Sequence, residues 1–290
     1  MFSAVQHLWT LMRTGATFER TGAMRAILDA MGLTGWPRFV LRAMAWPARP
    51  FGREGDAGLP PIARALQAMG PAYVKFGQIL STRPDVVGEE VVRQLRYLQD
   101  RLPPFDWDES RQIIEDEIGL AMDELIADLG EPVAAASIAQ VHPAIWRADG
   151  RKVAIKVLRP NVRAQFRRDI GSFYFIAGLI EAVVPGSERL RPKAVVGHFE
   201  SVVMAELDLR LEAAGANEYR DNVRSDERLY VPEILWAATG RRVLAMEWVE
   251  GMPIDPALLA ERGHDLTELA SRVIRIFLSH ALRDGYFHAD

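Results

Sequence analysis

The chain has 290 residues, of which 49% are hydrophobic and 26% are charged, as in an ordinary globular protein. This composition excludes a disordered tail, a collagen-like fibre and a low-complexity linker. Cysteine is absent, which excludes a disulfide framework, a zinc finger and a cysteine nucleophile. The 35 basic and 39 acidic residues give a net charge of −4, so we expect no nucleic-acid partner.

The length is sufficient for one large domain or two modest ones. No uninterrupted run of about 18 apolar residues occurs, so no membrane-spanning helix is predicted. Arg13 and Arg20 interrupt the N-terminal segment and no small-residue cleavage site follows, so we expect no secretory signal peptide. The expected setting is therefore reducing and cytoplasmic.

The first segment, residues 1–46, is predicted to form helices. Through Pro50 it holds six arginines, no lysine and two acidic residues. It also carries large aromatic residues, namely Phe2, Trp9, Trp36, Phe39 and Trp46. A basic, aromatic helical segment can lie on an anionic membrane surface. The alternative is a helix that packs on its own domain, and the sequence leaves both interpretations open.

Residues 61–81 have the period of a single amphipathic helix. The apolar residues that recur at helical spacing are Ile62, Leu66, Met69, Tyr73, Phe76 and Leu80. Lys75 and Gln78 are expected on the opposite face. Gly77 falls within the apolar stripe, where the missing side chain permits a close approach of another backbone.

From about residue 131 the pattern changes to short apolar runs. Alternation of Val153, Ile155 and Val157 predicts a strand over 151–157, and Asp149-Gly150 before it is a hairpin turn signal. Further strands are expected over 231–235 and 241–246. Helices are expected over 84–99, 161–184, 193–224 and 265–283. Asp108 is expected to cap another helix, with Glu109 in its first turn. This order predicts an α+β fold with a small antiparallel sheet.

Lys156 is the first candidate for chemistry, because it lies inside the apolar strand Val153-Ala154-Ile155-Lys156. Burying an ammonium group is costly unless an anionic partner neutralises it. In kinases a strand of this kind holds its lysine against nucleotide phosphates and a helix glutamate. The alternative is a lysine on the solvent face of an edge strand.

Three acidic residues on the expected helix 193–224 could serve as the partner of Lys156. Asp208 and Glu212 are four residues apart and therefore share a helix face. Glu206 and Glu212 differ by roughly 240° on an ideal helix, so they cannot face one pocket without a bend. A solvated acidic face is the alternative interpretation.

Two further segments have kinase-like features. Residues 132–142 are rich in alanine and occupy the place of a phosphate-binding Gly-rich loop, although alanine adopts positive φ less easily than glycine. Here the candidate residues are Ala134, Ala135, Ala136 and Ser137. At the other end, His288-Ala289-Asp290 matches the start of a kinase catalytic loop, in which the aspartate accepts a proton. An ordinary buried strand and a polar tail are the respective alternatives.

Other nucleotide and metal motifs are absent from the sequence. The chain has no G-x-G-x-x-G fingerprint and no G-x-x-x-x-G-K-[ST] loop, which excludes the Rossmann and P-loop interpretations. It also has no H-E-x-x-H sequence, and its six histidines are scattered, which argues against a His-rich metal site.

Taken together and in this order, these segments resemble the UbiB/AarF family of atypical kinases. The motifs that carry the resemblance are Lys75-Phe76-Gly77-Gln78 together with the following Ser81-Thr82-Arg83-Pro84-Asp85, then Ala134–His142, Val153–Val157, Glu206-Leu207-Asp208 with Glu212, Met246–Gly251 and Gly285–Asp290. The resemblance covers nearly the whole chain from about Met12. Six motifs in the family's order are far more specific than any one of them.

The resemblance implies a protein-kinase-like fold with four parts. Residues 1–60 would be an N-terminal helical segment, for which both membrane contact and packing on its own domain stay open, and 61–130 the helical extension that carries the K-x-G-Q motif. Residues 131–250 would form the small lobe, and 251–290 the exit from the hinge and the first part of the large lobe. The family continues beyond the position of Asp290, so we expect a C-terminally truncated chain that is inactive by itself.

The resemblance also implies a nucleotide site. Lys156 would bind the α- and β-phosphates of ATP, and Glu212 would hold Lys156. Lys75 and Gln78 would enter the pocket from the covering helix. Glu206 and Asp208 would line the same region. Met246 and Val249 would bracket the adenine, and Mg²⁺ would be held largely by residues of the family that follow Asp290.

By the same resemblance, the expected function is an ATP-dependent kinase-like ATPase that supports ubiquinone biosynthesis at the cytoplasmic face of the inner membrane. Its expected partners are ubiquinone-biosynthesis enzymes or prenylated precursors. An older label, polyprenylphenol hydroxylase, is disfavoured because no flavin or nicotinamide fingerprint occurs. Two alternatives stay open: a non-catalytic module that binds a lipid or partner at the membrane surface, and a helical scaffold without a ligand.

Overall fold

The computed structural model describes residues 2–30, 35, 46–98, 103–183, 189, 191–226, 229–252 and 254–286. The aromatic residues Trp36 and Phe39 and the predicted catalytic Asp290 lie outside these ranges. None of the helices in the described ranges is long and apolar enough to cross a membrane.

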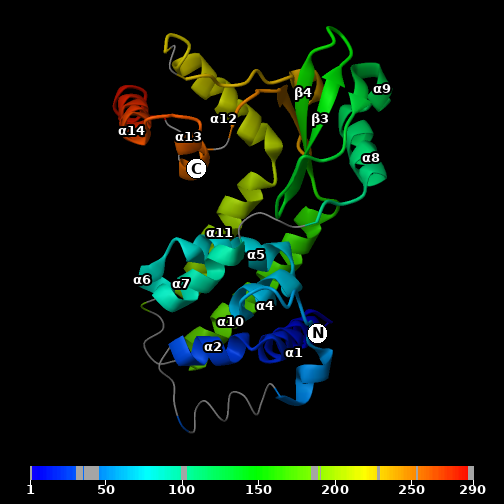
Figure 1. The fold of residues 1–290 in the computed structure, drawn as a ribbon. Helices are drawn as coiled ribbons and strands as arrows, with labels where there is room; N and C mark the ends of the chain where they lie inside the picture. Colours follow the sequence, from blue (N-terminus) through cyan, green and yellow to red (C-terminus); the bar gives the residue numbers. More distant parts are fainter. Residues whose placement is uncertain are drawn as a thin grey trace. The chain divides into compact units, whose positions relative to one another are not determined.

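The described chain divides into two compact units (Figure 1). The first unit consists of Met1–Pro104, Ala135–Ala139 and Arg159–Ala205. The second consists of Phe105–Ala134, Gln140–Leu158 and Glu206–Asp290. Each unit is therefore built from three segments that are distant in the sequence.

Helices make up the first unit. Before the sheet they are α1 (Phe2–Thr21), α2 (Ala23–Ala30), a 3-10 helix (Trp46–Phe51), α4 (Pro61–Met69), α5 (Pro71–Ser81), α6 (Pro84–Val87), α7 (Glu89–Leu95) and a second 3-10 helix (Arg96–Leu98). After the sheet they are α10 (Val162–Val183) and α11 (Pro192–Glu206), the last residue of which falls in the second unit.

The expected single helix over 61–81 is wrong, because the chain breaks into α4 and α5 at Gly70. Gly70 has a φ of 120°, in a region that favours glycine, and Pro71 starts the next helix without a backbone N–H. The expected helix over 84–99 is divided in the same way at Gly88, which has a φ of 81°. Glycine next to an N-terminal proline or acidic turn therefore marks a helix boundary here.

An aromatic cluster joins α5, α10 and α11 inside the first unit. The rings of Tyr73 and Phe173 meet edge to face with centroids 4.8 Å apart, and those of Phe76 and Phe199 do so at 5.3 Å. Such geometry adds about 0.5–1.5 kcal/mol per pair to the burial of the rings. The apolar stretch 173–180 of α10 is only partly buried, since Phe175 and Ile180 are each 38% exposed.

The second unit contains the sheet and the helices that pack on it. Its elements are α8 (Trp107–Ile118), α9 (Met122–Leu125), β1 (Ile126–Leu129), β3 (Ala139–Trp146), β4 (Lys152–Leu158), α12 (Leu209–Asn222), a 3-10 helix (Trp236–Ala238), β5 (Val243–Glu247), α13 (Pro256–Glu261) and α14 (Leu266–Arg283). In the described chain the sheet order is β1-β3-β4-β5, with β2 (Ala134–Ala135) paired to β3. The predicted α+β class is confirmed.

Strand prediction was correct for the hairpin and incomplete elsewhere. Gly150 adopts a φ of 74° in the turn between β3 and β4, as the Asp-Gly signal predicts. The expected strand 231–235 is wrong, since only Ile234 forms an isolated bridge, to Met246. Pro232 lacks the N–H that a strand ladder needs, which explains the failure. Strand β1 was not predicted at all.

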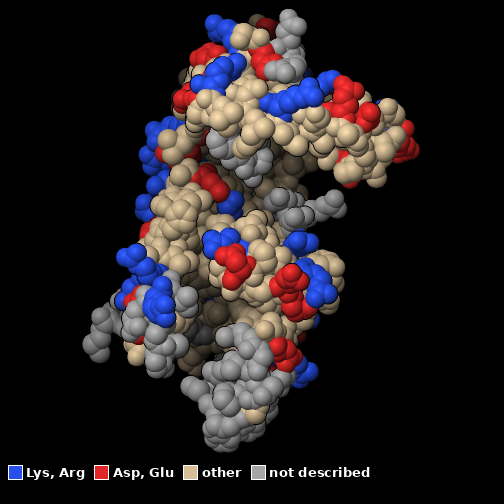
Figure 2. Space-filling model, turned by 90° about the vertical axis from the view of Figure 1, so that its left-hand side faces the viewer, with Lys and Arg blue, Asp and Glu red and all other residues tan. Residues whose placement is uncertain are grey.

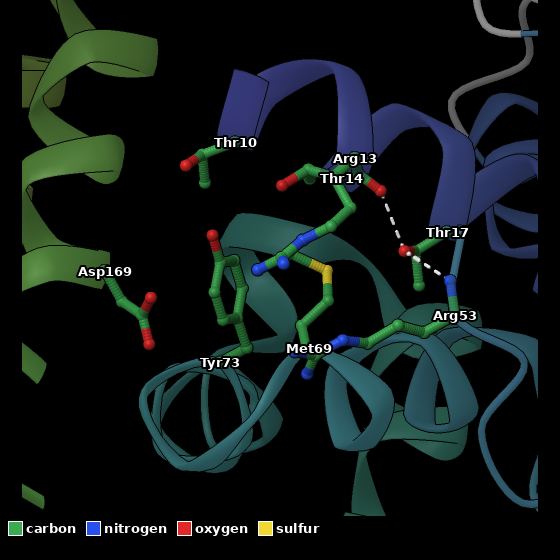
Figure 3. A pocket seen from close by; sticks show the side chains of 8 residues that line it. All are labelled: Thr10, Arg13, Thr14, Thr17, Arg53, Met69, Tyr73 and Asp169. Atoms are coloured by element: carbon green, nitrogen blue, oxygen red, sulfur yellow. Dashed lines mark hydrogen bonds between the residues drawn. The ribbon is translucent and has the colours of Figure 1, made fainter. Parts of the chain in front are cut away.

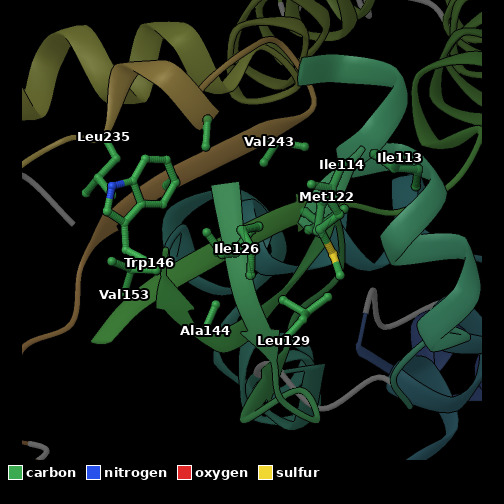
Figure 4. Close-up of a cluster of buried hydrophobic side chains, with 14 residues drawn as sticks. Ile113, Ile114, Met122, Ile126, Leu129, Ala144, Trp146, Val153, Leu235 and Val243 are labelled. Carbon is green, nitrogen blue, oxygen red and sulfur yellow. The ribbon is translucent and has the colours of Figure 1, made fainter. Parts of the chain in front are cut away.

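One face of the sheet carries the core of the second unit (Figure 4). Val153, Ile155 and Val157 are 0% exposed and pack with residues of α8 and α9. The other members of the cluster are Ile113, Ile114, Met122, Ile126, Leu129, Ala144, Trp146, Leu235, Ala238, Val243 and Ala245. The alternate residues of β4, including Lys156, therefore lie on the other face of the sheet.

Three buried polar side chains tie α8 to β3. Gln140 Nε2 donates to Ser110 Oγ at 2.8 Å and lies 2.9 Å from His142 Nε2. His142 Nδ1 lies 2.8 Å from the carbonyl oxygen of Gly130, so this nitrogen carries the proton and Nε2 accepts. Burial lowers the pKa of His142, which keeps its ring neutral at neutral pH.

The N-terminus of α8 is capped by Asp106, two residues before the predicted cap. The Asp106 carboxylate accepts a hydrogen bond from the backbone N–H of Asp108 at 2.8 Å. The spacing of Asp106 and Glu109 is that of a capping box, so the signal was present in the sequence.

We expect Asp106→Ala to lower the free energy of unfolding by about 1 kcal/mol, since one helix N–H loses its acceptor. The matched Asp108→Ala variant removes only a first-turn charge and is expected to cost less than about 0.5 kcal/mol. Urea denaturation followed by circular dichroism measures both values. Equal losses in the two variants would contradict the assignment of the cap.

Charges of both signs cover the surface. On the face shown in Figure 2, Lys and Arg side chains are interspersed with Asp and Glu side chains. Many of them form exposed ion pairs, such as Arg83 with Asp85 and Arg272 with Glu268. Pairs of this kind contribute little to stability, so the surface charges add solubility rather than structure.

Candidate functional site

Lys156 lies on the face of β4 opposite the hydrophobic core. Its neighbours Ile155 and Val157 are fully buried, whereas its own side chain is 26% exposed. In the register of the sheet Lys156 pairs with Leu244 of β5. The long aliphatic stem is therefore held against the sheet while the ammonium group reaches its outer side.

Glu212, in the first turn of α12, is the ionic partner of Lys156. The Nζ atom of Lys156 lies 2.8 Å from both carboxylate oxygens of Glu212. With 44% exposure of the Glu212 side chain, such a pair contributes on the order of 1 kcal/mol or less to stability. Its main effect is geometric, because it fixes the direction of the ammonium group.

The expected continuous helix over 193–224 is wrong, and the difference matters for this pair. Helix α11 ends at Glu206, and α12 begins at Leu209 after the non-helical Asp208, with φ −131° and ψ 91°. Glu206 and Glu212 therefore do not lie on one continuous helix, so the 240° separation expected for an ideal helix does not apply to them. Glu206 is half-buried at the end of α11.

Asp208 lies in this break and is surrounded by arginines. Hydrogen bonds from Arg210 lower the pKa of its carboxyl, and the charge of Arg241 acts in the same direction. The carboxylate therefore stays ionised well into the acidic range.

The proposed adenine neighbours lie at the end of β5. Met246 is half-buried and pairs with Ala154 in the register of β4 and β5. Val249, three residues later, is 49% exposed. Their contact with a nucleotide base stays a prediction.

Apart from Ala134, the remaining candidates belong to the first unit. Lys75 and Gln78 are both half-buried on α5, and Gln78 Nε2 donates to the carbonyl oxygen of Leu98 at 3.0 Å. In the alanine-rich loop Ala134 is exposed, Ala135 and Ala136 are half-buried and Ser137 is buried, while Arg159 Nε donates to the carbonyl oxygen of Ala136 at 3.0 Å. The nucleotide roles of these residues stay predictions.

Within the first unit, sequence reasoning missed a small polar pocket between α1, α5 and α10 (Figure 3). The cavity has a volume of about 20 Å³, space for roughly one water molecule. The lining residues are Thr10, Arg13, Thr14, Thr17, Arg53, Met69, Tyr73 and Asp169. Of these, the Tyr73 hydroxyl and Asp169 Oδ2 are buried without a hydrogen-bond partner.

Burial sets the ionisation of the two acids in this pocket. It raises the pKa of Tyr73 to about 12. It also raises the pKa of Asp169 to about 6, although the charges of Arg168, Arg13 and Arg53 oppose the rise. Asp169 is therefore a buried carboxylate that ionises close to neutral pH.

No cluster of three or more His, Asp or Glu side chains that could hold a metal ion occurs in the part of the chain that the structure describes. Asp208 is engaged by arginines, and Glu212 by Lys156. The described residues therefore do not by themselves fit a Mg²⁺ site, and we derive no chemical step through a metal.

The sequence pattern described as the ABC1 atypical kinase-like domain matches residues 97–290. That range is two thirds of the chain and includes the whole Lys156–Glu212 arrangement. The chain belongs to the ABC1 atypical kinase-like family. The resemblance seen in the sequence motifs is thereby confirmed, and the sheet with α12 is the small lobe of the ABC1 kinase-like domain.

Relatives of this ABC1 domain protein support the same assignment. A probable protein kinase UbiB of Marinobacter nauticus is 42% identical over 228 residues, which cover 78% of this chain and 42% of the relative. A probable protein kinase UbiB of Azotobacter vinelandii is 39% identical over 282 residues, covering 97% of this chain and 52% of the relative. The chain thus spans about half the length of the curated relatives it matches.

One solved structure is also similar, that of Rv3197 with erythromycin from Mycobacterium tuberculosis. It is 31% identical in sequence, with a TM-score of 0.48, over 65% of this chain and 46% of that chain.

Proposed function

We propose that this ABC1 kinase-like domain binds ATP and serves an ATP-dependent phosphoryl transfer or hydrolysis that supports ubiquinone biosynthesis. The observation that carries the proposal is the bidentate ion pair of Lys156 and Glu212 on the outer face of the sheet. The names of the relatives, probable protein kinase UbiB, supply the link to a kinase and to ubiquinone.

The geometry supports a defined role for each partner. The ammonium group of Lys156 donates to phosphate oxygens of the nucleotide, which charge-assisted hydrogen bonds stabilise. The ion pair with Glu212 already fixes the side chain of Lys156, so this side chain loses little conformational freedom when the nucleotide binds.

The other predicted residues complete the proposal. Met246 and Val249 contact the adenine, the alanine-rich loop 134–137 covers the phosphates, and Lys75 and Gln78 act from the helical extension. Asp290 would orient the acceptor or a water molecule. A bound Mg²⁺ supplies charge neutralisation between phosphate oxygens in kinases generally.

Replacing Lys156 with alanine tests the proposal. We expect the affinity for a non-hydrolysable ATP analogue with Mg²⁺ to fall at least tenfold, because a hydrogen bond to a charged group is worth about 1.5–3 kcal/mol. Isothermal titration calorimetry on the full 290-residue chain measures this affinity.

Lys152 provides the matched control on the same strand and the same face. It pairs with Glu250 at 3.3 Å, and its ammonium lies 4.0 Å from the centroid of the Trp248 ring. Lys152→Ala is expected to change nucleotide affinity less than twofold. Equal affinities of wild type and Lys156→Ala would refute the role of Lys156, and no nucleotide binding at all would favour the non-catalytic module.

A further inference from the structure

Asp208 has its hydrogen-bonding capacity filled by protein groups. Its Oδ1 atom accepts from Arg210 Nε at 2.8 Å and from the backbone N–H of Arg210 at 3.3 Å, as the N-cap of α12. Its Oδ2 atom accepts from Arg210 Nη2 at 2.6 Å and lies 3.5 Å from Arg241 Nε. A carboxylate with these four contacts, and only 15% exposure of its side chain, has little capacity left for a ligand.

The segment that Asp208 contacts is anchored to the rest of the second unit. The backbone N–H of Leu209 donates to the carbonyl oxygen of Arg241 at 3.0 Å. Glu117, near the end of α8, accepts from the backbone N–H of Arg241 and from Arg242 Nε, the latter at 2.7 Å. The start of α12 is thus fastened to the residues that lead into β5.

Both members of the ion pair depend on this junction. Leu158 of β4 donates its backbone N–H to the carbonyl oxygen of Arg242 at 2.9 Å. Two residues after Arg242, Leu244 of β5 pairs with Lys156. Glu212 lies four residues after Asp208, in the first turn that Asp208 caps. A shift of that turn would therefore move Glu212 relative to Lys156.

We infer that Asp208 is a positioning residue, which fixes the first turn of α12 against the β5 junction so that Glu212 holds Lys156. This role differs from the nucleotide contact that the motif resemblance implies for Asp208. The inference rests on the proposed function for its consequence in nucleotide binding, but the geometry it concerns exists without a nucleotide.

The first experiment measures the ion pair directly, in the nucleotide-free 290-residue chain. Lysine acetylation by a limiting amount of reagent is followed by mass spectrometry, with Lys152 as the internal reference. The Glu212 carboxylate holds the ammonium group of Lys156 at 2.8 Å and shields it from the reagent, so Glu212→Gln is expected to raise the labelling rate of Lys156 about threefold. Asp208→Ala is expected to raise it by a similar factor.

Two further variants separate positioning from other roles. Asp208→Asn keeps an equally good N-cap acceptor, so its labelling is expected within about 1.5-fold of wild type. The double variant Asp208→Ala with Glu212→Gln is expected to label no faster than Glu212→Gln alone, because Asp208 acts through Glu212. Wild-type labelling in Asp208→Ala, or multiplied effects in the double variant, would overturn the inference.

Nucleotide affinity of the same variants distinguishes the two proposals. We expect Asp208→Ala to weaken binding of the ATP analogue about threefold in the wild-type background and not at all in the Glu212→Gln background. An equal loss in both backgrounds overturns the inference alone. If Glu212→Gln and Lys156→Ala both bind as tightly as wild type, the proposed function fails, whereas the labelling result still decides whether Asp208 positions the pair.

Discussion

Replacing Ile155 with alanine is expected to lower the free energy of unfolding of the second unit by about 3 kcal/mol. Ile155 is 0% exposed in the centre of β4, and its side chain belongs to the cluster under α8. Truncation to alanine removes three carbon atoms from this core and leaves a cavity that a rigid sheet cannot close fully. Urea denaturation followed by tryptophan fluorescence measures the loss.

Two control variants show whether the loss depends on the size and burial of the side chain that is removed. Ile155→Val removes one methylene group and is expected to cost about 1 kcal/mol. Leu211→Ala, at a side chain that is 58% exposed on α12, is expected to cost less than about 0.5 kcal/mol. If Ile155→Ala cost no more than Leu211→Ala, the placement of this face of β4 in the core would be wrong.

Because Ile155 precedes Lys156, the same variant links stability to function. The substitution lowers the fraction of folded protein and leaves the Lys156 side chain in place, so any loss of nucleotide affinity in Ile155→Ala is expected to disappear when the fraction of folded protein is corrected for. In Lys156→Ala the loss is expected to persist after that correction, since the strand keeps its buried residues.

The sequence predicted the sheet where local signals and burial agree. Alternation of Val153, Ile155 and Val157 and the turn at Gly150 each point to one strand in one register, and the structure has both. The helix 265–283 was predicted from its periodic apolar pattern, and the structure has α14 at Leu266–Arg283, capped by Asp265.

The predicted single helices were wrong where the apolar pattern of a helix continues in the sequence although the helix itself is broken in the structure. The apolar spacing of 61–81 and 193–224 is unbroken in the sequence, but Gly70 and Asp208 adopt non-helical backbone angles. The break at Gly70 has a local signal in Gly70-Pro71, whereas at Asp208 the carboxylate meets Arg241 from a distant segment. A one-dimensional pattern contains no information on such a partner.

The candidate site was predictable in part. The ion pair of Lys156 with Glu212 followed from the motif resemblance, and the structure brings the two together at 2.8 Å. Helical spacing alone left a choice among Glu206, Asp208 and Glu212. The pocket around Asp169 had no sequence signal, because its lining comes from four helices and Arg53, which are separated in the sequence, and most of its residues are ordinary polar ones.

Replacing Asp169 with asparagine is expected to stabilise the first unit at pH 7.5. Burial raises the pKa of Asp169 to about 6 from 3.8, so the native state binds its proton more tightly than the unfolded state does. This difference corresponds to about 3 kcal/mol for a fully buried group. Partial contact of the side chain with solvent reduces the expected gain to about 1–2 kcal/mol.

The sign of the effect fixes its pH dependence. Above pH 6 the native state carries the buried charge and the wild type bears the full penalty, whereas below about pH 4 both states are protonated and the penalty is gone. The advantage of Asp169→Asn is therefore expected to shrink steadily between pH 6.5 and pH 4. Urea denaturation of both proteins across this range, compared at each pH, cancels the contributions of all other groups.

Tyr73→Phe is the matched control from the same pocket. It removes a buried hydroxyl that has no hydrogen-bond partner, so it is expected to be neutral or slightly stabilising, and because the pKa of Tyr73 is about 12 its effect should not vary between pH 4 and pH 7.5. A constant difference between Asp169→Asn and wild type over the same range would show that Asp169 is solvated in the native state. The buried carboxylate facing Tyr73 across the cavity in Figure 3 requires the difference to change with pH.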